Sequence, residues 1–230
     1  MLRRRLLGGQ QAIELPTVLF RLNFEDANLN DLTRVTDTVS GNSLIRDNTT
    51  GIQYINDPQF GRCMNILSQS LDNQMLGASS LFPNLYNARD RNISRTFIAW
   101  ANHTLEANSG FFNFNNTSLM GISSLNSPNV LATWSGFYVN RLGGANLNEI
   151  SMFCFKIQNA SFYTPNVGTT LTGWISQAMG TALANSPYFV LNGRDPNTNM
   201  FTGGIIAGIT VYEGAVTDEQ LLYILNNKII

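Results

Sequence analysis

Apolar and polar residues alternate with a period of two along much of the chain, which indicates strands that bury one face. In the first such segment, residues 17–24, every second residue from Val18 to Phe24 is apolar. Turn-forming pairs such as Asp57-Pro58 separate the segments. Many short strands joined by polar turns are typical of an all-β sandwich or barrel. The pattern predicts strands at 17–24, 95–102, 110–115, 136–141, 151–157, 188–191 and 205–212.

One helix is predicted near the end of the chain, at residues 218–226. Thr217 and Gln220 have the spacing of a capping box, in which each side chain bonds the backbone N–H of the other residue. Asp218 and Glu219 then lie in the first turn, where the helix dipole favours negative charge. The leucines and isoleucine that follow supply an apolar stripe. We therefore interpret the acidic pair as part of a helix start and not as a catalytic dyad.

The composition is that of a folded protein with little charge. The chain has 230 residues, of which 43% are hydrophobic and 13% are charged. A length of this size is compatible with one β-sandwich domain, which we place at residues 15–230. The 14 basic and 15 acidic residues nearly cancel, so the protein has no strong field to attract nucleic acid. Apolar runs are too short for a membrane-spanning helix, and we expect no membrane insertion.

The N-terminal residues 1–14 form a separate segment with three arginines, Arg3, Arg4 and Arg5. A signal peptide would continue into an apolar stretch, but Leu6 and Leu7 give way to glycine and glutamine. A disordered tail is the usual state of such a terminus. The alternative, which we favour, is a basic arm that docks on a partner through the arginines. That arrangement implies an assembly, and we expect a homo-oligomer.

The two cysteines, Cys63 and Cys154, lack the paired spacing that a zinc site requires. Each lies within an apolar stretch. We therefore predict two buried, reduced thiols.

Five segments resemble parts of laminin G-like domains, which have the concanavalin A-like jelly-roll fold. Leu19–Asp26 is similar to the first strand of the family, and 61–66 and 94–100 are similar to two further strands. The last strand and the helix start, 201–212 and 216–220, have the most specific similarity. The resemblance covers about residues 15–228. It implies an antiparallel jelly-roll sandwich with a short C-terminal helix.

One position departs from the laminin G-like pattern. Many members have an aspartate in the last strand, where this chain has Ala207. No Asp-x-Asp-x-Asp loop or similar set of oxygen ligands occurs elsewhere. We therefore expect no calcium, no other metal and no cofactor.

The first nine residues are similar to short N-termini of virion proteins of crAss-like tailed phages. This resemblance implies a protein that is assembled in the bacterial host cytoplasm and carried in the virion. Its partners would be other virion proteins, contacted through the basic arm, with a host surface glycan as a further partner.

Residues for catalysis are poorly placed in the sequence. A glycosidase needs two carboxylates across a cleft, but the six glutamates are scattered, and Glu25 and Asp26 point to opposite faces of a strand. Glu213 lies in the turn before the helix. The one histidine is His103, and the chain has no Gly-x-Ser-x-Gly motif to supply the serine nucleophile of a catalytic triad. We expect no enzyme activity.

Glycan recognition requires flat aromatic faces beside polar groups, and Trp134, Tyr138 and Asn140 are the candidate cluster. We expect Trp100 in the core between the sheets, while core and surface positions both stay open for Trp134. The leading hypothesis is a non-enzymatic structural component of a tailed-phage virion, as a capsid decoration, fibre or tail-associated module with a glycan-binding adhesion role. The alternatives are a stand-alone lectin-like module and a glycoside-active enzyme.

Overall fold

The structure is a computed structural model, and it describes a set of segments that spans most of the domain. They are residues 13–25, 31–46, 51–67, 75–82, 94–104, 110–113, 121–124, 130–133, 137–142, 149–159, 161–167, 171–178, 188–191 and 203–230.

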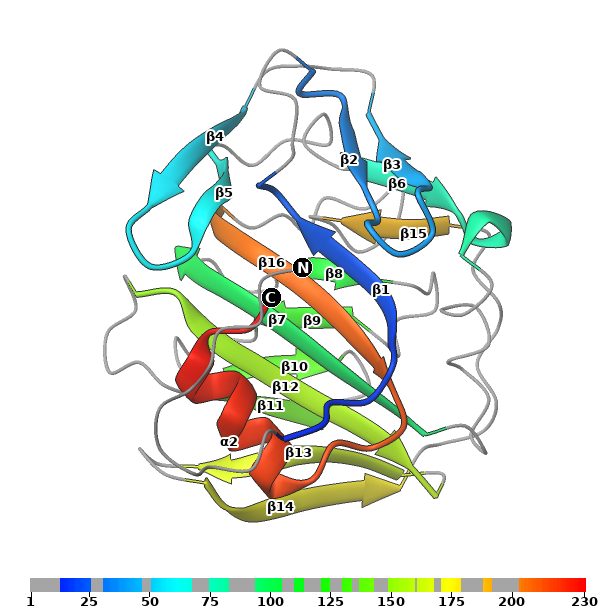
Figure 1. Ribbon diagram of the computed structural model, residues 1–230, viewed down its shortest axis with the longest axis vertical. Coiled ribbons are helices and arrows are strands. Elements are labelled where there is room, and N and C mark those ends of the chain that lie inside the picture. The colour runs from blue at the N-terminus through cyan, green and yellow to red at the C-terminus, as the bar shows by residue number, and fades with distance from the viewer. Residues whose placement is uncertain are drawn as a thin grey trace.

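Antiparallel strands make up most of the described residues, and one α-helix follows them (Figure 1). In chain order the strands are β1 (Val18–Asn23), β2 (Arg34–Thr36), β3 (Ser43–Ile45), β4 (Ile52–Asp57), β5 (Gly61–Ile66), β6 (Met75–Ala78), β7 (Arg95–Thr104), β8 (Gly110–Asn113), β9 (Gly121–Ser124), β10 (Val130–Thr133), β11 (Phe137–Leu142), β12 (Ser151–Gln158), β13 (Ser161–Val167), β14 (Leu171–Ala178), β15 (Tyr188–Leu191) and β16 (Gly203–Glu213). A short 3-10 helix, η2 (Ser79–Leu81), follows β6, and the α-helix is α2 (Asp218–Asn227).

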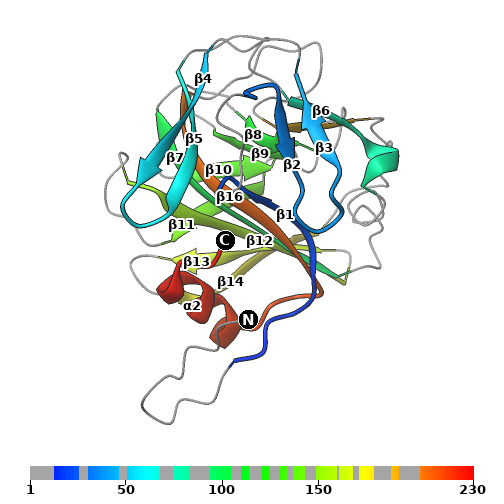
Figure 2. The same ribbon diagram turned by 45° about the horizontal axis from the view of Figure 1, so that its top comes forward.

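The strands form two layers, and Figures 1 and 2 show one behind the other. The front sheet has the order β4-β5-β16-β7-β12, with β1 beside β16 and the hairpin β13–β14 beside β12. The back sheet has the order β2-β3-β6-β15-β8-β9-β10-β11. Strand β11 joins the layers, because Arg141 and Leu142 pair with β12. The protein is therefore an antiparallel jelly-roll sandwich with a short C-terminal helix, as the sequence predicted.

All seven strands predicted from alternation are present, with boundaries that shift by a few residues. Alternation did not predict the other strands, and for four of them the length or the composition gives the reason. Strands β2 and β3 have three residues each, which is too short for a periodic signal. Strand β13 contains Pro165 and β14 contains Gly173, which weaken a strand pattern.

Strand β16 lies at the centre of the front sheet and changes its partner halfway. It pairs with β7 along its whole length on one side, whereas on the other side β5 pairs with its first part and β1 with its second. The change occurs at a bulge between Ile206 and Gly208. Because a bulge places two consecutive residues on one face, Ala207 and Gly208 both face away from the back sheet. A side chain at Gly208 would collide with Ile230, which lies on that face.

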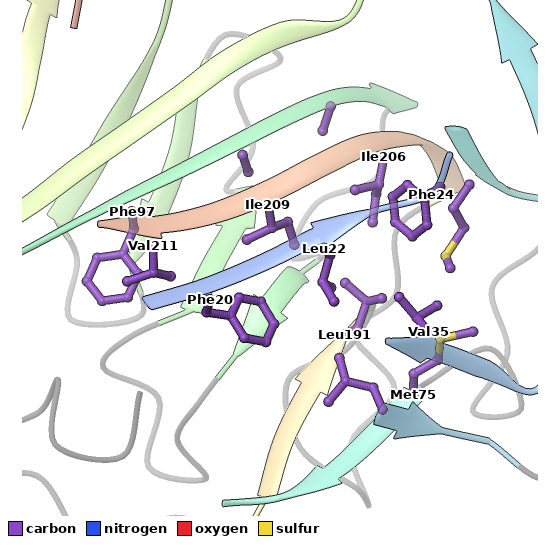
Figure 3. Packing of buried hydrophobic residues seen from close by; sticks show 14 of the residues in the cluster. Phe20, Leu22, Phe24, Val35, Met75, Phe97, Leu191, Ile206, Ile209 and Val211 are labelled. Atoms are coloured by element: carbon purple, nitrogen blue, oxygen red, sulfur yellow. The ribbon is translucent and has the colours of Figure 1, made fainter. Parts of the chain in front are cut away.

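The front sheet is covered on both faces, so the protein has two apolar cores. The inner core lies between the sheets, and Figure 3 shows part of it. The outer core lies between the front sheet and α2. Strand β12 is consequently buried along Ser151–Ile157, on both faces. The buried members of the outer core are Phe60, Cys63, Ile98, Trp100, Met152, Cys154, Ala207, Tyr212, Val216, Leu221 and Ile224.

Two predictions of the face of the front sheet on which a residue lies were wrong. Trp100 is buried, but it lies in the outer core beneath the C-terminal residues and not between the sheets. Its indole N–H donates to the carbonyl of Ile229 at 2.9 Å. Val18 does not share a face with Phe20, because a register shift between them turns Val18 toward the outer core. Alternation in a sequence does not reveal such bulges.

No helix among the described residues is long and apolar enough to cross a membrane.

Candidate functional site

The residues proposed from the sequence are only partly covered by the structure. Trp134 and the arginines Arg3, Arg4 and Arg5 lie outside the described residues. The backbone of Tyr138 and Asn140 lies on β11, paired with Ala132 and Val130 of β10 in the back sheet.

Tyr138 and Asn140 are two positions apart on one strand, so they belong to the same face of that strand. Trp134 belongs to the connection between β10 and β11 in the sequence. The predicted cluster thus maps to a single hairpin.

A second aromatic group lies on the outer side of the front sheet, where the hairpin β13–β14 meets α2 (Figure 2). We call Lys156, Tyr163, Trp174 and Asp218 the aromatic patch. Lys156 on β12 and Tyr163 on β13 are paired across the two strands. Trp174 lies on β14, and Asp218 is the first residue of α2.

Lys156 is the buried centre of the aromatic patch. Its side chain is 8% exposed, and its Nζ lies 3.6 Å from the centroid of the Trp174 ring and 5.9 Å from that of Tyr163. The ammonium also donates to the carbonyl of Val216 at 3.2 Å. Burial lowers the pKa of Lys156, while Cys154 and Asp218 act in the opposite direction. The Lys156 ammonium therefore makes its contacts inside the protein, and it holds the indole of Trp174 in place.

Trp174 and Asp218 form the accessible part of the aromatic patch. Trp174 is half-buried, and its indole N–H donates to Oδ1 of Asp218 at 2.5 Å. Asp218 is exposed, as are Ile175 and Ser176 beside the tryptophan. The arrangement offers an aromatic surface of fixed orientation next to a carboxylate that accepts hydrogen bonds. Sugar rings are recognised by this combination of a flat apolar face and a polar acceptor.

The helix start positions Asp218. The hydroxyl of Thr217 accepts from the backbone N–H of Gln220 at 3.2 Å, and the Gln220 side chain accepts from the backbone N–H of Thr217 at 2.9 Å. The predicted capping box is thereby confirmed. Gln220 also donates to the carbonyl of Glu14 at 2.7 Å, which fixes the segment before β1 against the helix.

The glutamates considered for catalysis have structural contacts. The carboxylate of Glu25 accepts from the backbone N–H of Arg62 at 2.9 Å, and the Arg62 guanidinium donates to the carbonyl of Glu25 at 2.7 Å. Gly61, at a φ of +71°, leaves the space that this carboxylate occupies. Glu213 is exposed, and its backbone N–H donates to the carbonyl of Thr17. Asp26 lies outside the described residues.

Ala207 is fully buried in the outer core. The position that carries an aspartate in many laminin G-like domains therefore holds a methyl group among apolar neighbours. Within the described residues, no group of three His, Cys, Asp or Glu side chains could hold a metal ion. For His103 the structure gives the backbone, which pairs with Gly204.

Sequence reasoning missed the aromatic patch because it joins residues of three strands and a helix. One signal was available in the sequence. The chain has only two lysines, and Lys156 interrupts an otherwise apolar strand. A lone cation in such a strand indicates a buried partner. The other lysine, Lys228, also lies over an indole, with its Nζ 5.1 Å from the Trp100 ring.

No protein-family model and no curated protein matches the sequence. Solved structures match it at the level of the fold. Domain 4 of AbnA, an extracellular arabinanase of Geobacillus stearothermophilus solved in complex with arabinotriose, has a TM-score of 0.50 and 16% identity. That match covers 92% of this chain and 100% of the domain.

Two larger proteins contain a similar fold. A botulinum neurotoxin type C structure, described by its dependence on two ganglioside molecules for cell entry, matches with a TM-score of 0.57 and 10% identity over 91% of this chain. A sialidase of Trypanosoma rangeli matches with a TM-score of 0.58 and 10% identity over 99% of this chain. This chain spans 50% of the neurotoxin chain and 36% of the sialidase chain. At such identities the similarity shows the β-sandwich fold alone.

Proposed function

We propose that the protein is a non-enzymatic glycan-binding module. The observation that carries the proposal is the accessible part of the aromatic patch, in which the half-buried indole of Trp174 is fixed beside the exposed carboxylate of Asp218. The fold supports it, because the arabinanase domain that matches over its full length was solved with a bound oligosaccharide. The predicted cluster of Trp134, Tyr138 and Asn140 is a second surface for the same activity.

A glycan array with the purified full-length chain tests the proposal. Binding should be detected, and Trp174→Ala should reduce it at least tenfold, because stacking on the indole is lost. Trp174→Phe is the matched variant, since it keeps an aromatic ring but removes the indole N–H. Trp134→Ala tests the second surface. The absence of binding to any glycan would overturn the proposal, and a loss in Trp134→Ala alone would move the site to the β10–β11 hairpin.

We propose further that this module is carried on a tailed-phage virion. The support is the basic N-terminal segment, which resembles the N-termini of crAss-like virion proteins. Charge-assisted hydrogen bonds from Arg3, Arg4 and Arg5 would anchor the module on other virion proteins, each contributing about 1.5–3 kcal/mol. Within the described residues, the segment before β1 is held by contacts such as that of the Glu14 carbonyl with Gln220.

Deletion of residues 1–12 tests the docking role of the arm. We expect lost association with particles and an unchanged melting temperature, since residues 13–17 keep their contacts with α2 and β16. A large drop in melting temperature would instead assign the arm to the domain itself. Light scattering of both forms measures the oligomeric state that the arm is expected to support.

The absence of enzyme activity is part of the proposal and has its own test. Glu25 binds the backbone of β5, and Asp218 binds Trp174 as it starts a helix. Incubation with bacterial polysaccharide should release no reducing ends. Release above a heat-treated control that Glu25→Gln or Glu213→Gln abolishes would make a glycoside-active enzyme the better assignment.

A further inference from the structure

Strand β14 lies at one edge of the front sheet (Figure 1). It pairs with β13 on one side, and within the described segments no strand pairs with its other side. Its residues, Leu171–Ala178, include no charged side chain and no proline. The strands at the ends of the sheet path differ, because β2 is short and carries Arg34, and β4 ends in Asp57. Charges and short strands protect an edge from pairing, so β14 is the edge that is open to another strand.

The pairing of β14 with β13 shows which backbone groups point to the open edge. Pro165 is opposite Trp174, and proline has no N–H to donate, so these two residues exchange no hydrogen bonds. In an antiparallel ladder, bonded and non-bonded pairs alternate. The N–H and C=O groups of Trp174 therefore point away from β13. Those of Ser176 and Ala178, which follow at intervals of two without a register shift, point the same way.

The side chains beside the open edge are accessible and uncharged. Ile175 is 45% exposed, and Ser176 is exposed as well. Successive residues of a strand point to opposite faces, so Ile175 lies on the face opposite to Trp174, whose indole belongs to the outer side. A strand that pairs with the open edge would cover part of Ile175 and leave the aromatic patch on the other face.

We propose that β14 is a dimer interface, at which it pairs in antiparallel orientation with β14 of a second copy of this chain. Trp174, Ser176 and Ala178 each offer one donor and one acceptor, so the edge is complementary to itself. A two-fold axis at Ser176 gives all three residues partners. In that register Trp174 pairs with Ala178 of the second copy, and Ser176 pairs with its own equivalent. No like charges meet, because the strand carries none.

The dimer joins the two front sheets into one continuous sheet. Antiparallel pairing places the two-fold axis at right angles to this sheet, so the outer faces of both copies lie on the same side. The two aromatic patches then face the same way. This consequence rests on the proposed function, since two glycan sites on one face would bind a surface with many glycans more tightly than one site does. The dimer itself does not depend on glycan binding.

Analytical ultracentrifugation of the full chain over a series of concentrations tests the interface. The wild type should form dimers. Ser176→Pro removes an N–H that points to the open edge and leaves the bonds to β13 in place. Because the axis brings both copies of Ser176 together, each dimer loses two hydrogen bonds, and the dissociation constant should rise about tenfold or more. Ser176→Ala keeps the N–H and should leave the dissociation constant unchanged.

Ile175 supplies a second test that decides the matter if Ser176→Pro does not fold. Ile175→Lys and Ile175→Glu each place like charges beside the axis, so each variant alone should be monomeric. An equimolar mixture of these two variants should form dimers again, because opposite charges then meet across the interface. Ile175→Thr is the uncharged control and should still dimerise.

Deletion of residues 1–12 separates this interface from association through the N-terminal arm. The β14 dimer should persist in the shortened chain. The proposal is overturned by a wild type that stays monomeric, by a dimer that is lost with the arm but kept in Ser176→Pro and Ile175→Lys, or by a charge-swapped mixture that stays monomeric. A persistent dimer that binds no glycan on an array would overturn the proposed function and leave the interface in place.

Discussion

Burial controls the chemistry of the two cysteines at the scale of single residues. Cys63 and Cys154 are both free thiols with 0% exposure in the outer core, which confirms the prediction of buried reduced cysteines. Burial raises the pKa of Cys63 to about 12 and also raises that of Cys154, on which Lys156 acts in the opposite direction. Since the thiolate is the reactive form, neither thiol should react in the folded protein.

The raised pKa values predict that stability falls as the pH increases above about 8.5, the ordinary pKa of cysteine. In that range the unfolded chain loses thiol protons that the folded chain retains, so the unfolded state binds fewer protons and the free energy of unfolding decreases. Urea unfolding at pH 7.5, 9 and 10 measures the slope. The Cys63→Ala, Cys154→Ala double variant should have a flatter slope than the wild type.

The double variant also separates the effect of the thiols on stability from the effect of Lys156. The lowered pKa of Lys156 changes the free energy of unfolding with pH in the opposite direction. Its ammonium loses a proton more readily in the folded state, so that contribution to stability increases with pH. An equal slope in the wild type and the double variant would contradict the assignment to the thiols.

Helix α2 covers the outer face of the front sheet, which would be exposed without it. Leu221 and Ile224 are buried against the outer core, while Leu222 is 40% exposed. The sequence predicted this helix because its start combines a capping box with an apolar stripe, both of which are local. The face of the sheet that it covers depends on tertiary packing, and the sequence did not indicate it.

Adjacent leucines on α2 give a matched test of the outer core. Leu221→Ala should lower the free energy of unfolding by about 2–5 kcal/mol, because it opens a cavity under the helix. Leu222→Ala should change it by about 0.5 kcal/mol or less, as expected for a surface position. Chemical denaturation of both variants is the measurement. Equal losses would show that α2 does not seal the front sheet.

The bulge in β16 provides a second test at the scale of elements. A methyl group at Gly208 would meet the side chain of Ile230 and, at 3.0 Å, the carbonyl oxygen of Leu22. Gly208→Ala should destabilise the protein by about 1–3 kcal/mol through overpacking. The added change Ile230→Gly should restore part of this loss, because it removes the flexible partner in the collision. If the double variant is destabilised by the sum of the single effects, the contact is absent.

At the scale of the whole molecule, the sequence predicted the class, the sandwich and the C-terminal helix, but not the arrangement of the two cores. Alternation identified strands such as 205–212. It did not show which residues of a strand face the inner core and which face the outer core, because both faces of the front sheet are covered by apolar residues. Trp174 and Asp218 are 44 positions apart in the chain, so the aromatic patch became visible only after folding.

The accessible charge of the aromatic patch predicts which glycans the protein binds. Asp218 and Glu219 are exposed at the start of α2, whereas Lys156 is 8% exposed and already bonded to Val216. A ligand therefore meets negative charge, and like charges across an interface oppose binding. Neutral glycans should be preferred over sialylated glycans that have the same core, by roughly tenfold at low salt, with a smaller preference at high salt.

A glycan array with paired neutral and sialylated structures measures this preference. The double variant Asp218→Asn, Glu219→Gln should lose most of the discrimination, because the amide oxygen introduced beside Trp174 can still accept from the indole N–H while the charge is gone. Leu222→Ala, on the exposed side of the same helix, should keep the preference unchanged. Equal or stronger binding of sialylated glycans by the wild type would overturn this prediction while leaving glycan binding in place, whereas binding to neither class would remove the proposed function itself.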